Sequence, residues 1–161
     1  IAVLSAGRLQ QVGTPRAIYE RPRSRFVATF LGTPPMNVVR AKVEAGACAV
    51  AGATITAPVA VGAGEIDLAF RPERARLDLS VKGDAAADRE ARLTGKVTFL
   101  EFLGDETIVH LALDGGATAR VRVPGFAAVS RGDDVGLCIE HAHLSWFDAK
   151  SGLLAGEDAA S

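Results

Sequence analysis

The stretch "GEIDLAFRPERARL" (residues 64–77) decides the fold, because it joins an apolar strand to a polar corner through which a strand cannot continue. The stretch "GDDVGLCIEHAHL" (residues 132–144) repeats this pattern. The alternating apolar positions are Ile66, Leu68 and Phe70 in the first stretch and Val135, Leu137 and Ile139 in the second. Such alternation is typical of a strand with one buried face. The corners are Arg71-Pro72-Glu73 and Glu140-His141, so the repeat predicts a barrel built in two parts.

The rest of the chain from Val38 onward carries the same kind of pattern. Apolar alternation is interrupted by turns rich in Gly and Asp, as at Gly104-Asp105 and at Gly132-Asp133. The expected strands are Val38–Val43, Ala49–Ala57, Glu65–Arg71, Leu93–Leu103, Thr107–Leu113, Ala117–Val123, Val135–Glu140 and Leu144–Phe147. Many short strands at this spacing indicate a sandwich or a small barrel. The segment Asp78–Ala91, rich in Ala and Asp, is expected to be an exposed loop.

The N-terminal residues predict a hairpin and two short helices. The tip of the hairpin is "LSAGR" (residues 4–8), because apolar runs flank a glycine turn. Thr14 followed by Pro15 is typical of a helix start, and a second helix is expected at Ser24–Leu31. The stripe that we expect this helix to pack into a core, in preference to a partner groove, is Phe26, Val27, Phe30 and Leu31.

A proline-rich linker at residues 34–37 marks the expected domain boundary, because each proline restricts its own backbone and that of its predecessor. We therefore expect a first unit at residues 1–33, a barrel domain at 38–155 and a tail at 156–161.

Composition narrows the classes of function. The chain has 161 residues and a formal net charge of -1, so it offers no excess of basic charge for a nucleic acid. Cys48 and Cys138 form no disulfide framework and fit a reducing compartment. Residues 45–64 carry no charge, but their glycines and Pro58 favour short strands and turns over a membrane span.

A nucleotide site is not predicted. A P-loop needs a glycine-rich backbone followed by Lys and then Ser or Thr. The nearest match, "GKVT" (residues 95–98), has Glu90 in place of the first glycine and Val97 in place of the hydroxyl residue. It also lies inside an expected strand, so this chain carries no Walker A motif.

Metal and acid–base chemistry are not predicted either. Cys138, His141, His143 and Asp148 are close in sequence and include zinc-ligand types, but a cysteine inside an apolar strand is typically a small buried hydrophobe. The remaining candidates for catalysis are Ser130, Ser145, His110, Glu101, Asp105 and Glu106. No turn motif singles out any of them, and the acidic ones fit a solvated hairpin corner. We therefore predict no enzyme activity and no catalytic, cofactor-binding or metal-binding residue.

Longer motifs carry a family resemblance. The stretch "IAVLSAGRLQQVGTPRAIYERPRSRFVATFLGTPPMNVV" (residues 1–39) resembles the segment after the switch histidine in ATP-binding subunits of bacterial sugar ABC importers of the maltose and glycerol-3-phosphate types. The stretches "FRPERARL" (70–77), "GKVTFLEFLGDET" (95–107) and "GDDVGLCIEHAHLSWFD" (132–148) resemble the transport-associated OB (TOBE) domain of the same subunits. The resemblance covers residues 1–155 and implies an OB-like barrel of the MOP type, mainly β.

The resemblance also implies a function. In the family this domain is non-catalytic, holds two ATPase subunits together as a homodimer, and in some members receives regulatory signals. The catalytic motifs of the family lie before Ile1, so no cofactor is expected here, whereas ATP and Mg²⁺ belong to the parent. The implied partners are transmembrane permease subunits and a regulatory protein, with no nucleic acid, on the cytoplasmic face of the membrane. Residues 1–13, separated from their parent sheet, are expected to be frayed, refolded or paired with another chain.

Two alternatives remain open. Barrels in molybdate-binding relatives hold oxyanions, and the candidate residues for an oxyanion or sugar site here are Thr94, Lys96 and Ser130. A single-stranded nucleic acid on an OB surface would need basic grooves and stacking aromatics, and it ranks last.

Overall fold

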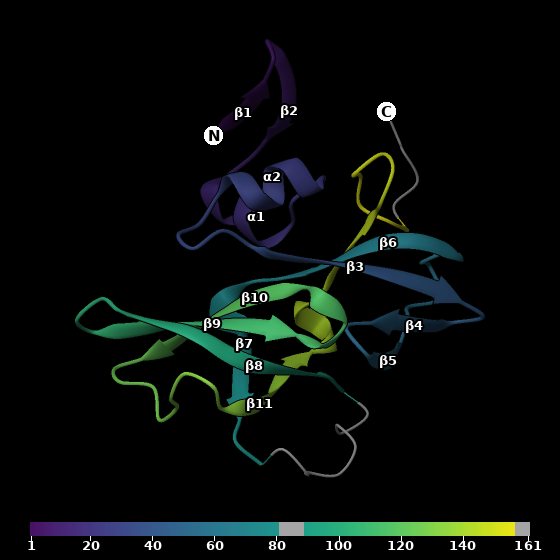
Figure 1. Cartoon of the computed structure of the whole chain (residues 1–161). Helices are drawn as coiled ribbons and strands as arrows, with labels where there is room; N and C mark the ends of the chain where they lie inside the picture. The colour runs from purple at the N-terminus through teal and green to yellow at the C-terminus, as the bar shows by residue number, and fades with distance from the viewer. Residues whose placement is uncertain (81–88, 157–161) are drawn as a thin grey trace.

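The computed structural model describes residues 1–80 and 89–156. These residues form two five-stranded antiparallel sheets and a separate two-stranded hairpin, so the predicted mainly β fold is confirmed. The hairpin and the two short helices lie together on one side of the barrel (Figure 1). Two predicted features lie wholly or partly outside the described residues: the tail beyond residue 156, and residues 81–88 of the expected loop Asp78–Ala91.

The first sheet has the strand order β12-β6-β3-β4-β5. Its strands are β3 (Asn37–Glu44), β4 (Ala47–Val50), β5 (Ala53–Thr56), β6 (Gly64–Phe70) and β12 (Ser145–Asp148). The expected single strand Ala49–Ala57 is wrong, because a tight turn divides it. Ala51 and Gly52 both have positive φ, 47° and 77°, which is the backbone of a two-residue hairpin turn.

The second sheet has the order β10-β9-β8-β11-β7. Its strands are β7 (Ala75–Asp78), β8 (Glu90–Phe102), β9 (Glu106–Leu113), β10 (Thr118–Pro124) and β11 (Asp134–Glu140). The expected loop Asp78–Ala91 is therefore shorter at both ends than predicted. Ala91 is completely buried and lies opposite Ile139 of β11. A single buried alanine beside charged residues gives too weak a periodic signal to mark the start of a strand.

The two repeated stretches occupy equivalent places in the barrel. β6 belongs to the first sheet, and the short 3₁₀ turn Pro72–Arg74 carries the chain to β7 in the second sheet. β11 belongs to the second sheet, and the turn His141–His143 carries the chain back to β12 in the first. Each corner thus moves the chain between the sheets, in opposite directions, and the expected two-part construction is confirmed.

The core lies between the two sheets. Fully buried apolar side chains from both sheets meet there, including Leu68, Leu93, Val121 and Leu137. Gly95, the glycine of the rejected P-loop match, lies inside β8, where an added Cβ would be 2.7 Å from the carbonyl oxygen of Ala112. A close approach of two backbones therefore explains this glycine, and phosphate binding is not needed to explain it.

The N-terminal elements form a small unit with its own apolar contacts. They are β1 (Ala2–Ser5), β2 (Arg8–Val12), α1 (Pro15–Glu20) and α2 (Arg25–Phe30). The helix starts are as predicted, since the hydroxyls of Thr14 and Ser24 accept hydrogen bonds from the first turns of α1 and α2. The hairpin is closed and not frayed, because Val3 is buried with Ile18 and Val27.

The buried face of α2 agrees with the predicted stripe at Val27 and Leu31 but not at the two phenylalanines. Val27 is 0% exposed, and Leu31 packs against the cluster that contains it. Ala28 packs against Ala69 and Phe147 on the outer face of β6 and β12, because a small side chain lets the helix approach the sheet closely. Phe26 and Phe30 are instead 40% and 60% exposed and stack on each other. Within residues 1–80 and 89–156, no helix has the length and apolar character needed to cross a membrane.

Candidate functional site

Arg71, at the corner after β6, connects the barrel to both N-terminal helices. One guanidinium nitrogen, Nη1, donates hydrogen bonds to the carbonyl oxygens of Ala28 (3.1 Å) and Leu31 (2.6 Å) at the end of α2. The other, Nη2, donates to the carbonyl oxygen of Tyr19 (2.9 Å) near the end of α1. Carbonyl groups in the last turn of a helix have no partner within the helix, so a cation is favoured at both ends. One side chain thus binds both helix ends.

The surroundings of Arg71 are apolar and aromatic. Its side chain is 5% exposed, and its guanidinium carbon lies 3.9 Å from the centre of the Tyr19 ring. Burial lowers the pKa of Arg71, while the charges of Tyr19 and Glu73 act in the opposite direction. The Tyr19 hydroxyl donates to the carboxylate of Glu73; burial, followed by this hydrogen bond and charge, raises the pKa of Tyr19. The Arg71-Pro72-Glu73 corner therefore contacts Tyr19 through both of its charged residues.

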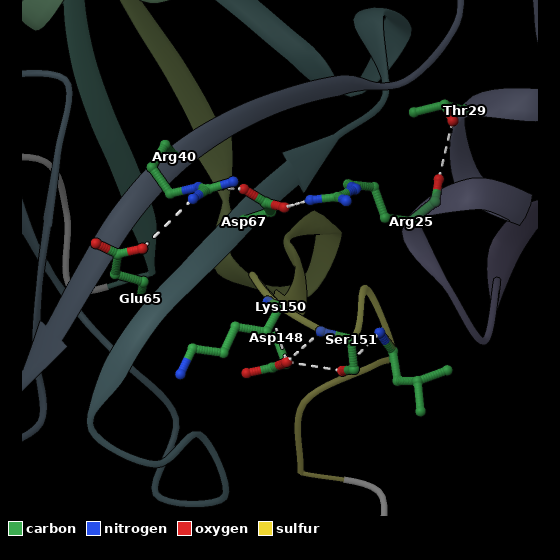
Figure 2. Close-up of polar contacts among 9 residues, drawn as sticks. Arg25, Thr29, Arg40, Glu65, Asp67, Asp148, Lys150 and Ser151 are labelled. Carbon is green, nitrogen blue, oxygen red and sulfur yellow. Dashed lines mark hydrogen bonds and ion pairs between the residues drawn. The ribbon is translucent and has the colours of Figure 1, made fainter.

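A buried carboxylate makes a second connection between α2 and the barrel (Figure 2). Asp67 in β6 is 2% exposed. One of its oxygens accepts a hydrogen bond from Arg25, the first residue of α2, and the other accepts from Nε of Arg40 in β3 at 2.7 Å. Arg40 also lies 3.5 Å from the exposed carboxylate of Glu65. Asp67 thus joins the helix to two neighbouring strands.

The chain after β12 returns to the start of α2. The carboxylate of Asp148 accepts hydrogen bonds from the backbone N–H of Ser151 (2.7 Å) and of Lys150 (3.2 Å), which forms a tight turn (Figure 2). These hydrogen bonds, led by the one from Ser151, lower the pKa of Asp148. Beyond the turn, the N–H of Arg25 donates to the carbonyl of Gly152 at 2.7 Å. The N-terminal end of α2 is therefore held by the last described residues of the chain.

The predicted linker is also attached to the barrel. The side-chain amide of Asn37 donates to the carbonyl of Arg120, and the N–H of Arg120 donates back to the amide oxygen of Asn37, both at 2.8 Å. The carbonyl of Thr33, the residue before the linker, accepts a hydrogen bond from Arg122, which lies 3.1 Å from the carboxylate of Glu106. Asn37 is itself the first residue of β3, so its bonds join β3 to β10. We refer to Arg71, Asp67 and their partners as the helix–barrel interface.

The residues suggested for an oxyanion site contact carboxylates and a carbonyl oxygen, which repel an anion. The hydroxyl of Thr94 donates to the carboxylate of Asp114. Nζ of Lys96 lies 2.6 Å from the carboxylate of Asp134 and donates to the carbonyl of Gly132 at 3.2 Å. The N–H of Ser130 donates to Asp133 at 2.8 Å. A bound oxyanion would have to compete with a carboxylate at each of these three residues.

The residues considered for metal binding or catalysis each make a separate structural contact and do not form one site. Cys138 is 5% exposed inside β11, and Asp148 is used in the turn described above. His143 lies 3.8 Å from Glu140, and His110 stacks edge-on against Phe99 and lies 3.5 Å from Glu101. Across the part of the chain that the structure describes, no three His, Cys, Asp or Glu side chains are arranged to hold a metal ion.

The two cysteines are expected to be unreactive in the folded chain. Burial raises the pKa of Cys48 to about 11 and also raises the pKa of Cys138, although Arg76 and Arg92 oppose this. Because the thiolate is the reactive form, an aromatic disulfide reagent at about pH 8 should modify neither thiol in the native chain. The unfolded chain is the control and should release two equivalents of the chromophore. Rapid reaction of either cysteine in the native chain would contradict this prediction.

Comparison with known proteins identifies the class. A family model described as "TOBE domain" matches residues 68–147, and this part of the chain belongs to that family. The fold also resembles the structure of the cytoplasmic molybdate-binding protein ModG, with a TM-score of 0.56 and 22% identity, over 68% of this chain and 94% of that chain. The predicted MOP-type fold is therefore confirmed.

The sequence relatives place the chain within larger subunits. It is 33% identical over 149 residues to the sn-glycerol-3-phosphate import ATP-binding protein UgpC of Rhizobium meliloti, covering 92% of this chain and 40% of the relative. It is 37% identical over 158 residues to the alpha-glucoside transport ATP-binding protein AglK of the same organism, covering 92% and 41%. The chain thus corresponds to the C-terminal TOBE region of ABC importer ATP-binding subunits, and it spans about two fifths of the length of these relatives.

Proposed function

We propose that this chain is the non-catalytic regulatory and dimerisation region of an ATP-binding subunit in a carbohydrate or glycerol-3-phosphate importer. The observation that supports this most is the contact of Arg71 with both helices. The same corner of the barrel binds the C-terminal ends of α1 and α2, and these helices resemble the end of the ATP-binding domain. A displacement of either part is therefore transmitted to the other through a charged, buried contact.

In this proposal the chemistry lies elsewhere in the longer subunit. ATP and Mg²⁺ bind the preceding domain, which also contacts the transmembrane permease on the cytoplasmic side of the membrane. The barrel pairs with the barrel of a second subunit, and this symmetric contact keeps the two ATPase sites close to each other while they open. A regulatory protein that binds the barrel would act on the ATPase sites through the helix–barrel interface.

Sedimentation equilibrium over a range of chain concentrations tests whether two copies of the chain pair through their barrels. We expect a reversible monomer–dimer equilibrium, and a monomer at every concentration would contradict the proposal.

A thermal-shift panel with ATP, molybdate and sugars tests the absence of a ligand site, because a ligand at 100 times its Kd stabilises the folded state by about 2.7 kcal/mol. We expect no shift, and a shift with ATP would contradict the non-catalytic assignment.

A further inference from the structure

The hairpin formed by β8 and β9 carries an exposed aromatic surface at its tip. Phe99, Phe102 and Leu103 are 57%, 48% and 52% exposed. Phe126, from the loop after β10, is 80% exposed and stacks on Phe102 with ring centres 4.1 Å apart. The hairpin projects from the barrel on the side away from β4 and β5 (Figure 1). Because successive side chains of a strand point to opposite faces, Phe102 and Phe126 lie on one face of the hairpin, and Phe99 and Leu103 lie on the other. We call these four side chains, which flank the hairpin on both faces, the hairpin-tip patch; exposed apolar side chains of this size that gather at one place are typical of an interaction surface.

The strand that carries the patch also has an unpaired edge. β8 pairs with β9 as far as Phe102, but with β11 only as far as Lys96. Val97 still bonds to the loop before β11, through the N–H of Gly132 and the carbonyl of Asp133. The pairing with β9 then shifts at Thr98. In residues 1–80 and 89–156, no strand lies along the outer edge of residues 98–102.

The direction of the backbone groups on this edge follows from the hairpin turn. The N–H of Leu103 donates to the carbonyl of Glu106 at 2.9 Å, toward the β9 side. Because the direction alternates along a strand of an antiparallel pair, Glu101 and Phe99 also bond toward β9. Leu100 and Phe102 therefore direct their N–H and C=O groups away from β9. An edge of this kind is a template for another strand.

We propose that the patch and edge bind the same segment of a second copy of this chain, antiparallel, with the two-fold axis at Leu100. This inference rests on the proposed dimeric function and assigns its surface. A two-fold contact joins the same surface of both copies, and Leu100 presents both a donor and an acceptor to its counterpart. In this register the two Leu100 residues exchange two hydrogen bonds, and Phe99 lies opposite the partner's Glu101.

Charge selects this register over its neighbour. A shift that placed the axis at Glu101 would still match donors with acceptors, because Leu100 would face the partner's Phe102. It would also place two Glu101 carboxylates directly opposite each other, and like charges at opposite positions destabilise a strand pair. With the axis at Leu100, the two stacked pairs of Phe102 and Phe126 lie on either side of the axis, so both copies gain apolar burial.

Cysteine cross-linking tests the register. Opposed residues in a hydrogen-bonded antiparallel pair have Cα atoms about 5.5 Å apart, which lies within the range of about 4.4–6.8 Å that a disulfide spans. Leu100→Cys should therefore form a disulfide-linked dimer on mild oxidation, whereas Glu101→Cys, the matched control, should remain uncrosslinked. The native cysteines are 0% and 5% exposed and contribute no background. Cross-linking of Glu101→Cys in place of Leu100→Cys would overturn the register.

A charge swap tests the surface. Phe99→Glu would face the partner's Glu101, and we expect it to weaken dimerisation at least tenfold in Kd. The double variant Phe99→Glu with Glu101→Lys should restore the affinity, because opposite charges then face each other. Phe30→Glu, at a similarly exposed phenylalanine of α2, should leave Kd unchanged. A wild-type dimer insensitive to Phe99→Glu would overturn this surface and leave the proposed function standing, whereas a wild-type monomer would overturn both.

Discussion

Replacing Arg71 with methionine should lower the free energy of unfolding by about 3–5 kcal/mol, because three backbone carbonyl oxygens lose a charged donor and a buried polar group left unsatisfied costs about 1–3 kcal/mol. The carbonyl oxygens of Tyr19, Ala28 and Leu31 lose their donor at once, and the stacking on the Tyr19 ring is lost with them. For a chain of this length, each 1 kcal/mol changes the melting temperature by about 2–4 °C. Differential scanning calorimetry and urea unfolding would both measure the effect.

Two further variants separate the hydrogen bonds from the effect of charge. Arg74→Met, three residues away on the same corner and exposed, should change the stability by less than about 0.5 kcal/mol. Arg71→Lys keeps the charge but lacks the planar fork that reaches both helix ends, so it should recover only part of the loss. If Arg71→Met and Arg74→Met destabilised the chain equally, the buried contact would not hold the helices.

The barrel could be predicted from the sequence because its signals are local. Alternating apolar residues and the following polar corner lie within one stretch, such as residues 64–77, and they specify both the strand and the point where it ends. The contacts that Arg71 makes from this corner with the two helices could not be predicted from a local pattern. Arg71 is separated by 43, 40 and 52 positions from the residues whose carbonyls it binds, and no periodic pattern encodes a contact over that distance.

The environments of Phe26, Phe30 and Asp67 were also not predicted, because they depend on contacts between segments that are distant in the sequence. Size and spacing predict that Phe26 and Phe30 lie in a core, but α2 buries Val27 and Ala28, and the small side chain of Ala28 is the one that packs on the sheet. Asp67 was not singled out, although one signal was available. It is an acidic residue inside the apolar run Ile66–Phe70, and a buried charge of this kind requires a partner. The sequence does not show that the partners are Arg25 and Arg40.

Asp67→Asn should lower the free energy of unfolding by about 2–3 kcal/mol, since hydrogen bonds to charged groups each contribute about 1.5–3 kcal/mol and the arginines regain part of the loss in water. The amide keeps the shape of the carboxylate, but one of its two polar atoms becomes a donor that faces an arginine. Arg25 and Arg40 are 37% and 57% exposed at their side chains, whereas Asp67 is 3% exposed. The carboxylate is therefore the buried member, and its removal affects both the α2 contact and the β3 contact.

Glu65→Gln is the matched control, because it removes the exposed partner of Arg40. Its side chain is 69% exposed and lies 3.5 Å from Arg40, so its loss should cost less than about 1 kcal/mol. Salt distinguishes the two variants: about 0.5 M NaCl should abolish the difference between Glu65→Gln and wild type but leave most of the Asp67→Asn effect, because buried pairs are screened much less than exposed ones. Urea unfolding at both salt concentrations measures this. Equal losses in the two variants, or an Asp67→Asn effect that disappears in salt, would mean that α2 is held on the barrel without the buried carboxylate.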